Sequence, residues 1–497
     1  MSENPKDTKI AKNILLYGIG GILSQAAGLI TLPLMVHTLT SAEYGTIEVI
    51  TAATGYFSIL IGLNTLSGLY RFFYEAENNR DNQKTLVSTA VIFVILCGII
   101  VGLVSYFLSP IFSRNLFNSP DNTRNIQLAF WALIPVALYN YSMGLLRIQN
   151  RALAYNIISL IVSAFYMGSI VVLMGSLKVG IPGYYYSQII ANSVGTAIAL
   201  FLSRHFLIFR FSRFWFTKLA KYSFPLIPGS LFAWSLSANN RLFLNASTDP
   251  IQVAYYGLAN KAAIVITLAT QAFCNAWEPT MYALLKQEEK MREKLPTVLT
   301  LYGFGTLCIC ILMMTCAREL FLLLAPPEYL AGVGLLGIIQ LRWIFTMGVY
   351  IIDPGTAKSG KTYWVTVMLG IAVVVNLLCN AILTPLLGLY GAVLSELIGY
   401  AAAMVGRWII SNHFFPIRWN YQYFSRAVIF YSLFASAQTF IIFSDLTWLW
   451  GFLIRSGLGI IFIIILWNSM DSVSKKTILN ILNNFLKKIN ITKKPVQ

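Results

Sequence analysis

The lysines and arginines of this chain lie almost entirely in alternate gaps between its hydrophobic segments. Fourteen apolar segments of roughly 18–25 residues can be marked, each long enough to cross a bilayer core of about 30 Å. The N-terminal tail, the even-numbered gaps and the C-terminal tail contain 26 of the 36 lysines and arginines, and two more, Arg204 and Arg407, lie at the predicted cytoplasmic ends of spans 6 and 12. The odd-numbered gaps contain only Arg114, Arg124, Lys178 and Arg318. This is the positive-inside pattern of a membrane protein, and it predicts that both termini are cytoplasmic.

Composition excludes an ordinary soluble domain, because the mean hydropathy is +0.68 and only 11% of the residues are charged. The net charge of +17 is dispersed through short cytoplasmic loops. Anionic membrane lipids explain this distribution better than nucleic acid does. The N-terminal tail resembles a signal peptide, but its apolar stretch from Ile14 to Val36 is too long for one, so we expect an uncleaved first span.

Helices are the expected spanning form, because backbone polar groups in lipid must be satisfied within the segment. The sequence therefore predicts an all-α integral membrane protein. No gap between spans is long enough for a folded soluble domain. The predicted spans are 14–37, 45–69, 85–108, 125–146, 155–175, 184–206, 225–245, 252–276, 297–317, 332–352, 364–383, 391–411, 427–444 and 448–467.

An internal repeat relates spans 6 and 12. The motif Gly180–Gly183 recurs as Gly388–Gly391, and at the same offset of 208 three further pairs match: Ser187 with Ser395, Ser203 with Ser411, and His205 with His413. Six spans separate the two copies, and six is even, so the repeats would be parallel. We therefore expect two six-helix lobes around a central cavity, with two additional C-terminal helices.

This organisation divides the chain into five parts. They are the N-lobe at 1–206, a linker at 207–223, the C-lobe at 224–412, spans 13 and 14 at 413–470, and a basic amphipathic cytoplasmic tail at 471–497. The linker interleaves basic and aromatic residues, which favours a helix lying in the cytoplasmic membrane interface. A plain positive loop is the alternative.

Charged residues inside spans indicate where function could reside, since each costs about 2.5–3.5 kcal/mol at a helix centre. Arg241 with its neighbour Asn240 lies in span 7, Lys261 in span 8 and Arg342 in the middle of span 10. These residues could line one polar cavity; snorkelling or pairing with a carboxylate is the alternative. Arg71 lies at the end of span 2, where it could face the mouth of the cavity or anchor the helix at the membrane interface. For Arg455 in span 14 we favour a structural role.

Two acids within spans, Glu48 and Glu396, are candidates for coupling transport to a proton or a sodium ion. Pairing with a positive residue or capping a helix is the alternative. The six cysteines and three histidines show no ligand spacing, so we expect no metal site and no cofactor. The sequence also lacks a nucleotide-binding loop and a catalytic set, which argues against an enzyme.

Several segments, by their sequence and by their order along the chain, resemble the polysaccharide transporter branch of the multidrug/oligosaccharidyl-lipid/polysaccharide exporter superfamily. This branch includes O-antigen repeat-unit flippases. The resemblance covers nearly the whole chain. One departure is Asn240, where members often have an acid. The segments are 39–45, 71–75, 147–155, 222–228, 240–244, 256–261 and 277–279.

The resemblance implies a flippase of the bacterial inner membrane that moves a polyprenyl-diphosphate-linked oligosaccharide to the outer leaflet by alternating access, within lipopolysaccharide or similar polysaccharide assembly. Other polysaccharide-assembly proteins are then expected partners. Arg241, Lys261 and Arg342 would hold the diphosphate, because arginine binds phosphate oxygens bidentately. Three alternatives remain open at this stage: a lipid-linked peptidoglycan-precursor flippase, a cation or drug antiporter, and an integral-membrane glycosyltransferase or polymerase.

Overall fold

The structure is a computed structural model that describes residues 28–76, 79–285, 287–419, 421–480 and 483. Within these ranges the chain is helical and contains no strand, as the sequence predicts. Most of the predicted first span lies outside the described residues. Its described end is the helix Gly28–Thr38. The predicted C-terminal tail also lies largely outside them.

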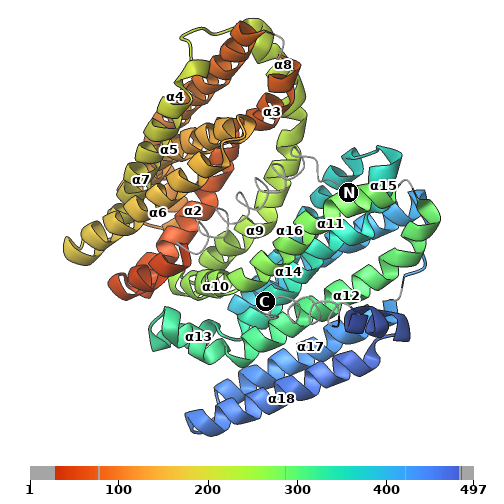
Figure 1. Ribbon diagram of the computed structural model, residues 1–497. Helices are drawn as coiled ribbons and strands as arrows, with labels where there is room; N and C mark the ends of the chain where they lie inside the picture. The colour runs from red at the N-terminus through yellow and green to blue at the C-terminus, as the bar shows by residue number, and fades with distance from the viewer. Residues whose placement is uncertain (1–27, 77–78, 286, 420, 481–482, 484–497) are drawn as a thin grey trace, which may run out of the picture. The chain divides into compact units, whose positions relative to one another are not determined.

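The helices follow the predicted spans closely (Figure 1). In the first half they are α2 (Ser41–Gly62), α3 (Thr65–Glu75), α4 (Arg80–Phe117), α5 (Thr123–Ile148), α6 (Ala152–Ile170), α7 (Ile181–Leu202), α8 (Arg213–Ser223) and α9 (Ile227–Ser247). In the second half they are α10 (Pro250–Ala262), α11 (Ile264–Leu284), α12 (Glu288–Thr315), α13 (Ala317–Leu324), α14 (Leu335–Ile352), α15 (Pro354–Ser359), α16 (Tyr363–Phe414), α17 (Tyr421–Ile442) and α18 (Trp448–Ser469).

Nine helices of the described residues are long and apolar enough to cross a membrane. The number becomes ten if α10 and α11, which meet at an angle of 44°, form one broken span. The protein is therefore a multi-pass membrane protein, while the total of fourteen spans stays a prediction. Part of the difference lies in α16, which combines predicted spans 11 and 12. A straight helix of its 52 residues would be about 78 Å long, more than twice the bilayer core.

Gly388 divides α16, since its backbone angles of φ 54° and ψ −126° are not helical. Its predicted counterpart in the repeat, Gly180, precedes α7 with a similar φ of 71° and ψ of −145°. The paired serines also behave alike: Ser203 accepts a hydrogen bond from Gln149 after α5, and Ser411 accepts one from the Gly355 backbone after α14. These local likenesses support the repeat, and the arrangement of two six-helix lobes stays a prediction.

The chain forms two compact units. Unit 1 comprises Met1–Gly257, Leu323–Pro326 and Leu377–Ala392, and unit 2 comprises Leu258–Leu322, Pro327–Asn376 and Val393–Gln497. In unit 1, α4, α5, α6 and α7 pack against one another, and α8 covers the ends of α3 and α4. In unit 2, α17 and α18 lie side by side along α12 (Figure 1).

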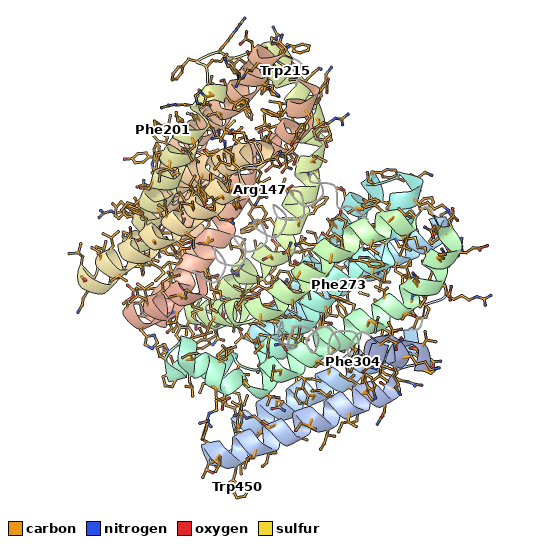
Figure 2. All side chains as sticks on the ribbon, viewed as in Figure 1. Arg147, Phe201, Trp215, Phe273, Phe304 and Trp450 are labelled. Carbon is orange, nitrogen blue, oxygen red and sulfur yellow. The ribbon has the colours of Figure 1, made fainter. Side chains whose placement is uncertain are left out.

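The predicted interfacial linker contains α8, a short amphipathic helix. Trp215 and Leu219 are buried in the core of unit 1, whereas Phe209 and Phe214 are exposed. Lys218 forms an ion pair with Glu75 at 2.8 Å. Trp215 anchors this helix at the end of the unit 1 bundle (Figure 2). Such a surface suits a membrane interface, although its location there stays a prediction.

Candidate functional site

The first candidate site is an ion pair between α9 and α2 in unit 1. The Nε atom of Arg241 lies 3.0 Å from Oε2 of Glu48, and the two side chains are 16% and 9% exposed. The hydroxyl of Tyr44 donates a hydrogen bond to the other oxygen of Glu48, and the guanidinium lies 5.4 Å from the ring centre of Tyr256. Arg241 therefore remains partly accessible while its charge is balanced.

The second candidate site is an ion pair between α14 and α16 in unit 2. Nη1 of Arg342 lies 2.5 Å from Oε1 of Glu396, and Glu396 is completely buried. The rings of Trp343 and Tyr400 lie 4.7 Å and 5.8 Å from the guanidinium carbon. The deepest arginine predicted from the sequence is thus enclosed by a carboxylate and two aromatic rings.

The structure therefore pairs each predicted coupling acid with a predicted phosphate-binding arginine. The sequence alone does not predict these pairs, because Arg241 and Glu48 are far apart in the chain, as are Arg342 and Glu396. A paired guanidinium can change partner from a carboxylate to a phosphate oxygen. Pairing with a residue of opposite charge is the alternative that the sequence left open for all four side chains.

Asn240 belongs to a neutral buried cluster. Asn380 donates a hydrogen bond of 2.8 Å to its side-chain oxygen, and Thr384 donates one of 2.8 Å to Asn380. The three side chains are fully buried. This cluster links α9 to α16 within unit 1, and Asn240 stands in it where members of the resembled family often have an acid.

The remaining predicted residues lie at helix ends. Lys261 is in the last turn of α10, immediately before the bend to α11. Arg71 is exposed near the end of α3, with its guanidinium 4.8 Å from the ring centre of Tyr222 and 5.7 Å from that of Phe72. These contacts with aromatic rings favour the role of interfacial anchor, one of the two roles that the sequence left open for Arg71.

Two further charged pairs have a structural geometry. Arg455, 1% exposed, forms hydrogen bonds of 3.1 and 2.6 Å to the two oxygens of Glu319 and one of 2.7 Å to the carbonyl of Thr315. Arg407 in α16 binds Asp353 at 2.5 Å, where α14 ends. Both arginines bind residues at helix ends in unit 2, and the structural role of Arg455 stays a prediction.

A cavity of about 500 Å³ lies within unit 1. The sequence did not predict it, because the charges within spans that indicated a site lie mostly in the second half. The available signal was the row of tyrosines and amides in span 6. Unit 2 contains a separate pocket of about 370 Å³ that exposes only apolar surface. The unit 1 cavity is lined by side chains of α2, α5, α6, α7 and α9, among them Thr51, Ser163, Tyr166, Tyr185, Gln188, Asn192 and Trp234.

The fold is that of known membrane transporters. The inward closed conformation of the lipid II flippase MurJ has a TM-score of 0.67 and 17% identity, covering 91% of this chain and 98% of that one. An inward-facing multidrug resistance MATE family transporter of the MOP superfamily has a TM-score of 0.60 and 15% identity, covering 78% of this chain and 97% of that one. These likenesses, at 17% and 15% identity, show that the chain has the fold of these multi-pass membrane proteins.

The family follows from the sequence. Residues 34–332, more than half of the chain, match the family described as "Polysaccharide biosynthesis protein", and the chain belongs to this family. A Haemophilus influenzae relative, "Lsg locus putative protein 1", is 22% identical over 305 residues, which is 58% of this chain and 69% of the relative.

Proposed function

We propose that the protein is a flippase for a polyprenyl-diphosphate-linked oligosaccharide, such as an O-antigen repeat unit, and moves it from the cytoplasmic to the outer leaflet by alternating access. The family supports a substrate of polysaccharide biosynthesis. The ion pair between Arg241 and Glu48 is the observation that carries the proposal, because it holds a partly exposed guanidinium within membrane helices.

A diphosphate would displace the carboxylate from the guanidinium during transport. Arginine can bind two phosphate oxygens at once, which compensates for the loss of the carboxylate. The displaced Glu48 would then be a buried unpaired acid, a state that favours uptake of a proton. Exchange of the carboxylate for a phosphate at Arg241 would thus couple substrate binding to protonation of Glu48. Arg342 and Glu396 would undergo the same exchange if the helices around them separate.

The alternatives fit the charges less well. A cation antiporter needs acids available to its substrate, yet among the described residues the buried acids Glu48, Asp353 and Glu396 each pair with an arginine. A peptidoglycan-precursor flippase would also bind a diphosphate, and the family favours a polysaccharide precursor over it.

The related sequence predictions are part of the same proposal. The protein would lie in the bacterial inner membrane with both termini cytoplasmic, and its basic linker would bind anionic lipids. Two parallel lobes would open alternately on the two sides. Lys261 would bind the diphosphate together with Arg241, and other polysaccharide-assembly proteins would receive the product.

Transport in proteoliposomes tests the proposal. A labelled lipid-linked oligosaccharide is placed in both leaflets, and its accessibility to an external glycosidase is followed with and without proton and sodium gradients. We expect wild-type protein to expose the inner-leaflet label and Arg241→Ala to remove at least nine tenths of the activity. Equal rates for wild-type protein and empty liposomes would refute the flippase function.

A further inference from the structure

The cavity of unit 1 has a chemically neutral lining. Among the described residues that line it, none is charged, and the polar groups are hydroxyls and side-chain amides. Tyr185 is 2% exposed, and its hydroxyl, although close to Thr51, makes no hydrogen bond of normal geometry within the described residues. A buried hydroxyl of this kind is destabilising unless a ligand or water satisfies it.

Aromatic side chains form the other part of the lining. Trp234 is held by a hydrogen bond of 3.0 Å from its indole nitrogen to the carbonyl of Ala52. Gly55 permits this position, because a Cβ atom there would lie 2.0 Å from the indole ring. Tyr139 and Tyr166 provide further rings. Flat aromatic faces beside hydroxyls and amides suit a polar uncharged molecule that also has apolar C–H surfaces, which describes a sugar.

The internal repeat strengthens this conclusion. At the offset of 208 that relates Gly180 to Gly388, Gln188 of the cavity corresponds to Glu396. In unit 2 that position carries a charge balanced by Arg342, whereas in unit 1 it is a neutral amide. The two halves therefore differ in what they can bind at equivalent positions, and the unit 1 cavity is unsuited to a phosphate.

The Arg241–Glu48 pair lies on two helices, α9 and α2, that also line the cavity. On α2, Glu48, Thr51 and Gly55 are spaced three and four residues apart and share one face. On α9, Trp234 and Arg241 are seven residues apart, which is close to two full turns. A ligand with a diphosphate at Arg241 would therefore place its next groups in the cavity.

We propose that this cavity is a saccharide site, which holds the first sugars of the transported lipid while Arg241 holds its diphosphate. This inference rests on the proposed function. It assigns recognition of the glycan to Gln188, Asn192, Tyr185 and Trp234, and it limits the arginines to the phosphates that every such lipid shares.

Cysteine protection tests the site. Ser163→Cys places a thiol in the cavity, and Ser425→Cys places one in the apolar pocket of unit 2 as a matched control. Each protein, in nanodiscs, is alkylated with N-ethylmaleimide, and mass spectrometry separates the new thiol from the six native cysteines. The probes are the lipid-linked oligosaccharide extracted from the source cells and a polyprenyl diphosphate without sugar.

We expect the oligosaccharide lipid to slow alkylation at position 163 at least fivefold and the sugar-free lipid to leave that rate unchanged. The two lipids should have the same effect on the alkylation rate at position 425. Tyr185→Phe and Gln188→Leu should each weaken binding of the oligosaccharide lipid about tenfold and leave binding of the sugar-free lipid unchanged. Equal effects of both lipids at position 163, or none, would overturn the saccharide site. Transport by wild-type protein is measured in parallel, so a cavity without protection in an active flippase refutes this inference alone.

Discussion

At the scale of single residues, the Arg241–Glu48 and Arg342–Glu396 pairs differ in how deeply their charges are buried. The side chain of Arg241 is 16% exposed, whereas those of Arg342 and Glu396 are 7% and 0% exposed. Burying a charge requires a partner, and removal of one partner leaves the other uncompensated. A loss of transport after a single substitution at Arg342 would therefore be ambiguous between structure and function.

A pair of variants resolves this ambiguity. We expect Arg342→Ala to destabilise the protein by about 3–5 kcal/mol, because Glu396 remains buried without its partner. The double variant Arg342→Met with Glu396→Leu should recover most of that stability, measured by thermal unfolding in detergent. If the pair exchanges its carboxylate for substrate, the double variant stays inactive in transport; an active double variant would show that the pair is structural.

The Glu319–Arg455 pair predicts a pH dependence. Burial acts to raise the pKa of Glu319, but the hydrogen bonds and charge of Arg455, a backbone hydrogen bond and the hydrogen bond from Trp448 together outweigh it and hold the pKa below its ordinary value. A lowered pKa in the folded state adds stability that is present above about pH 4.3 and is lost as the pH falls through the lowered value. We expect the melting temperature to fall in that acidic window. Glu319→Gln should show a smaller fall, and an unchanged one would contradict the assignment.

At the scale of elements, glycine marks two breaks in the helices, before α7 and within α16. Gly180 and Gly388 both have positive φ and strongly negative ψ, a region that other residues adopt only at a cost. The sequence motif located both breaks. It could not predict the backbone angles at these breaks, because periodicity reports apolar faces and not backbone conformation.

Substitution of these glycines tests the strain directly. At Gly388 the nearest atom to an added Cβ is 4.0 Å away, so crowding is absent and only the backbone conformation opposes a side chain. We expect Gly388→Ala and Gly180→Ala each to destabilise the protein by about 1–3 kcal/mol. Gly457→Ala in α18, where an added Cβ meets nothing within 4 Å, should be neutral or stabilising. Equal effects at all three positions would refute the argument.

At the scale of the whole molecule, the sequence predicted the helical class, most helix positions and the family resemblance. These follow from hydropathy and from the cost of unsatisfied backbone groups in lipid. It did not predict which side chains pair, as with Glu48 and Arg241, because contacts between distant helices leave no periodic signal. For the same reason the sequence did not predict the cavity around Gln188. Neutral polar residues within an apolar span give a weaker signal than charged ones.

The membrane orientation is the prediction that belongs to the whole chain. Twenty-eight of the 36 lysines and arginines lie on one predicted side, since translocation of positive loops is disfavoured. Asp249, between α9 and α10, should therefore face outward, and Lys290, at the start of α12, should face the cytoplasm. We expect a membrane-impermeant maleimide to label Asp249→Cys in intact cells and to label Lys290→Cys only after permeabilisation. Labelling of Lys290→Cys in intact cells would invert the topology, and the proposed direction of transport would then have to be reversed with it.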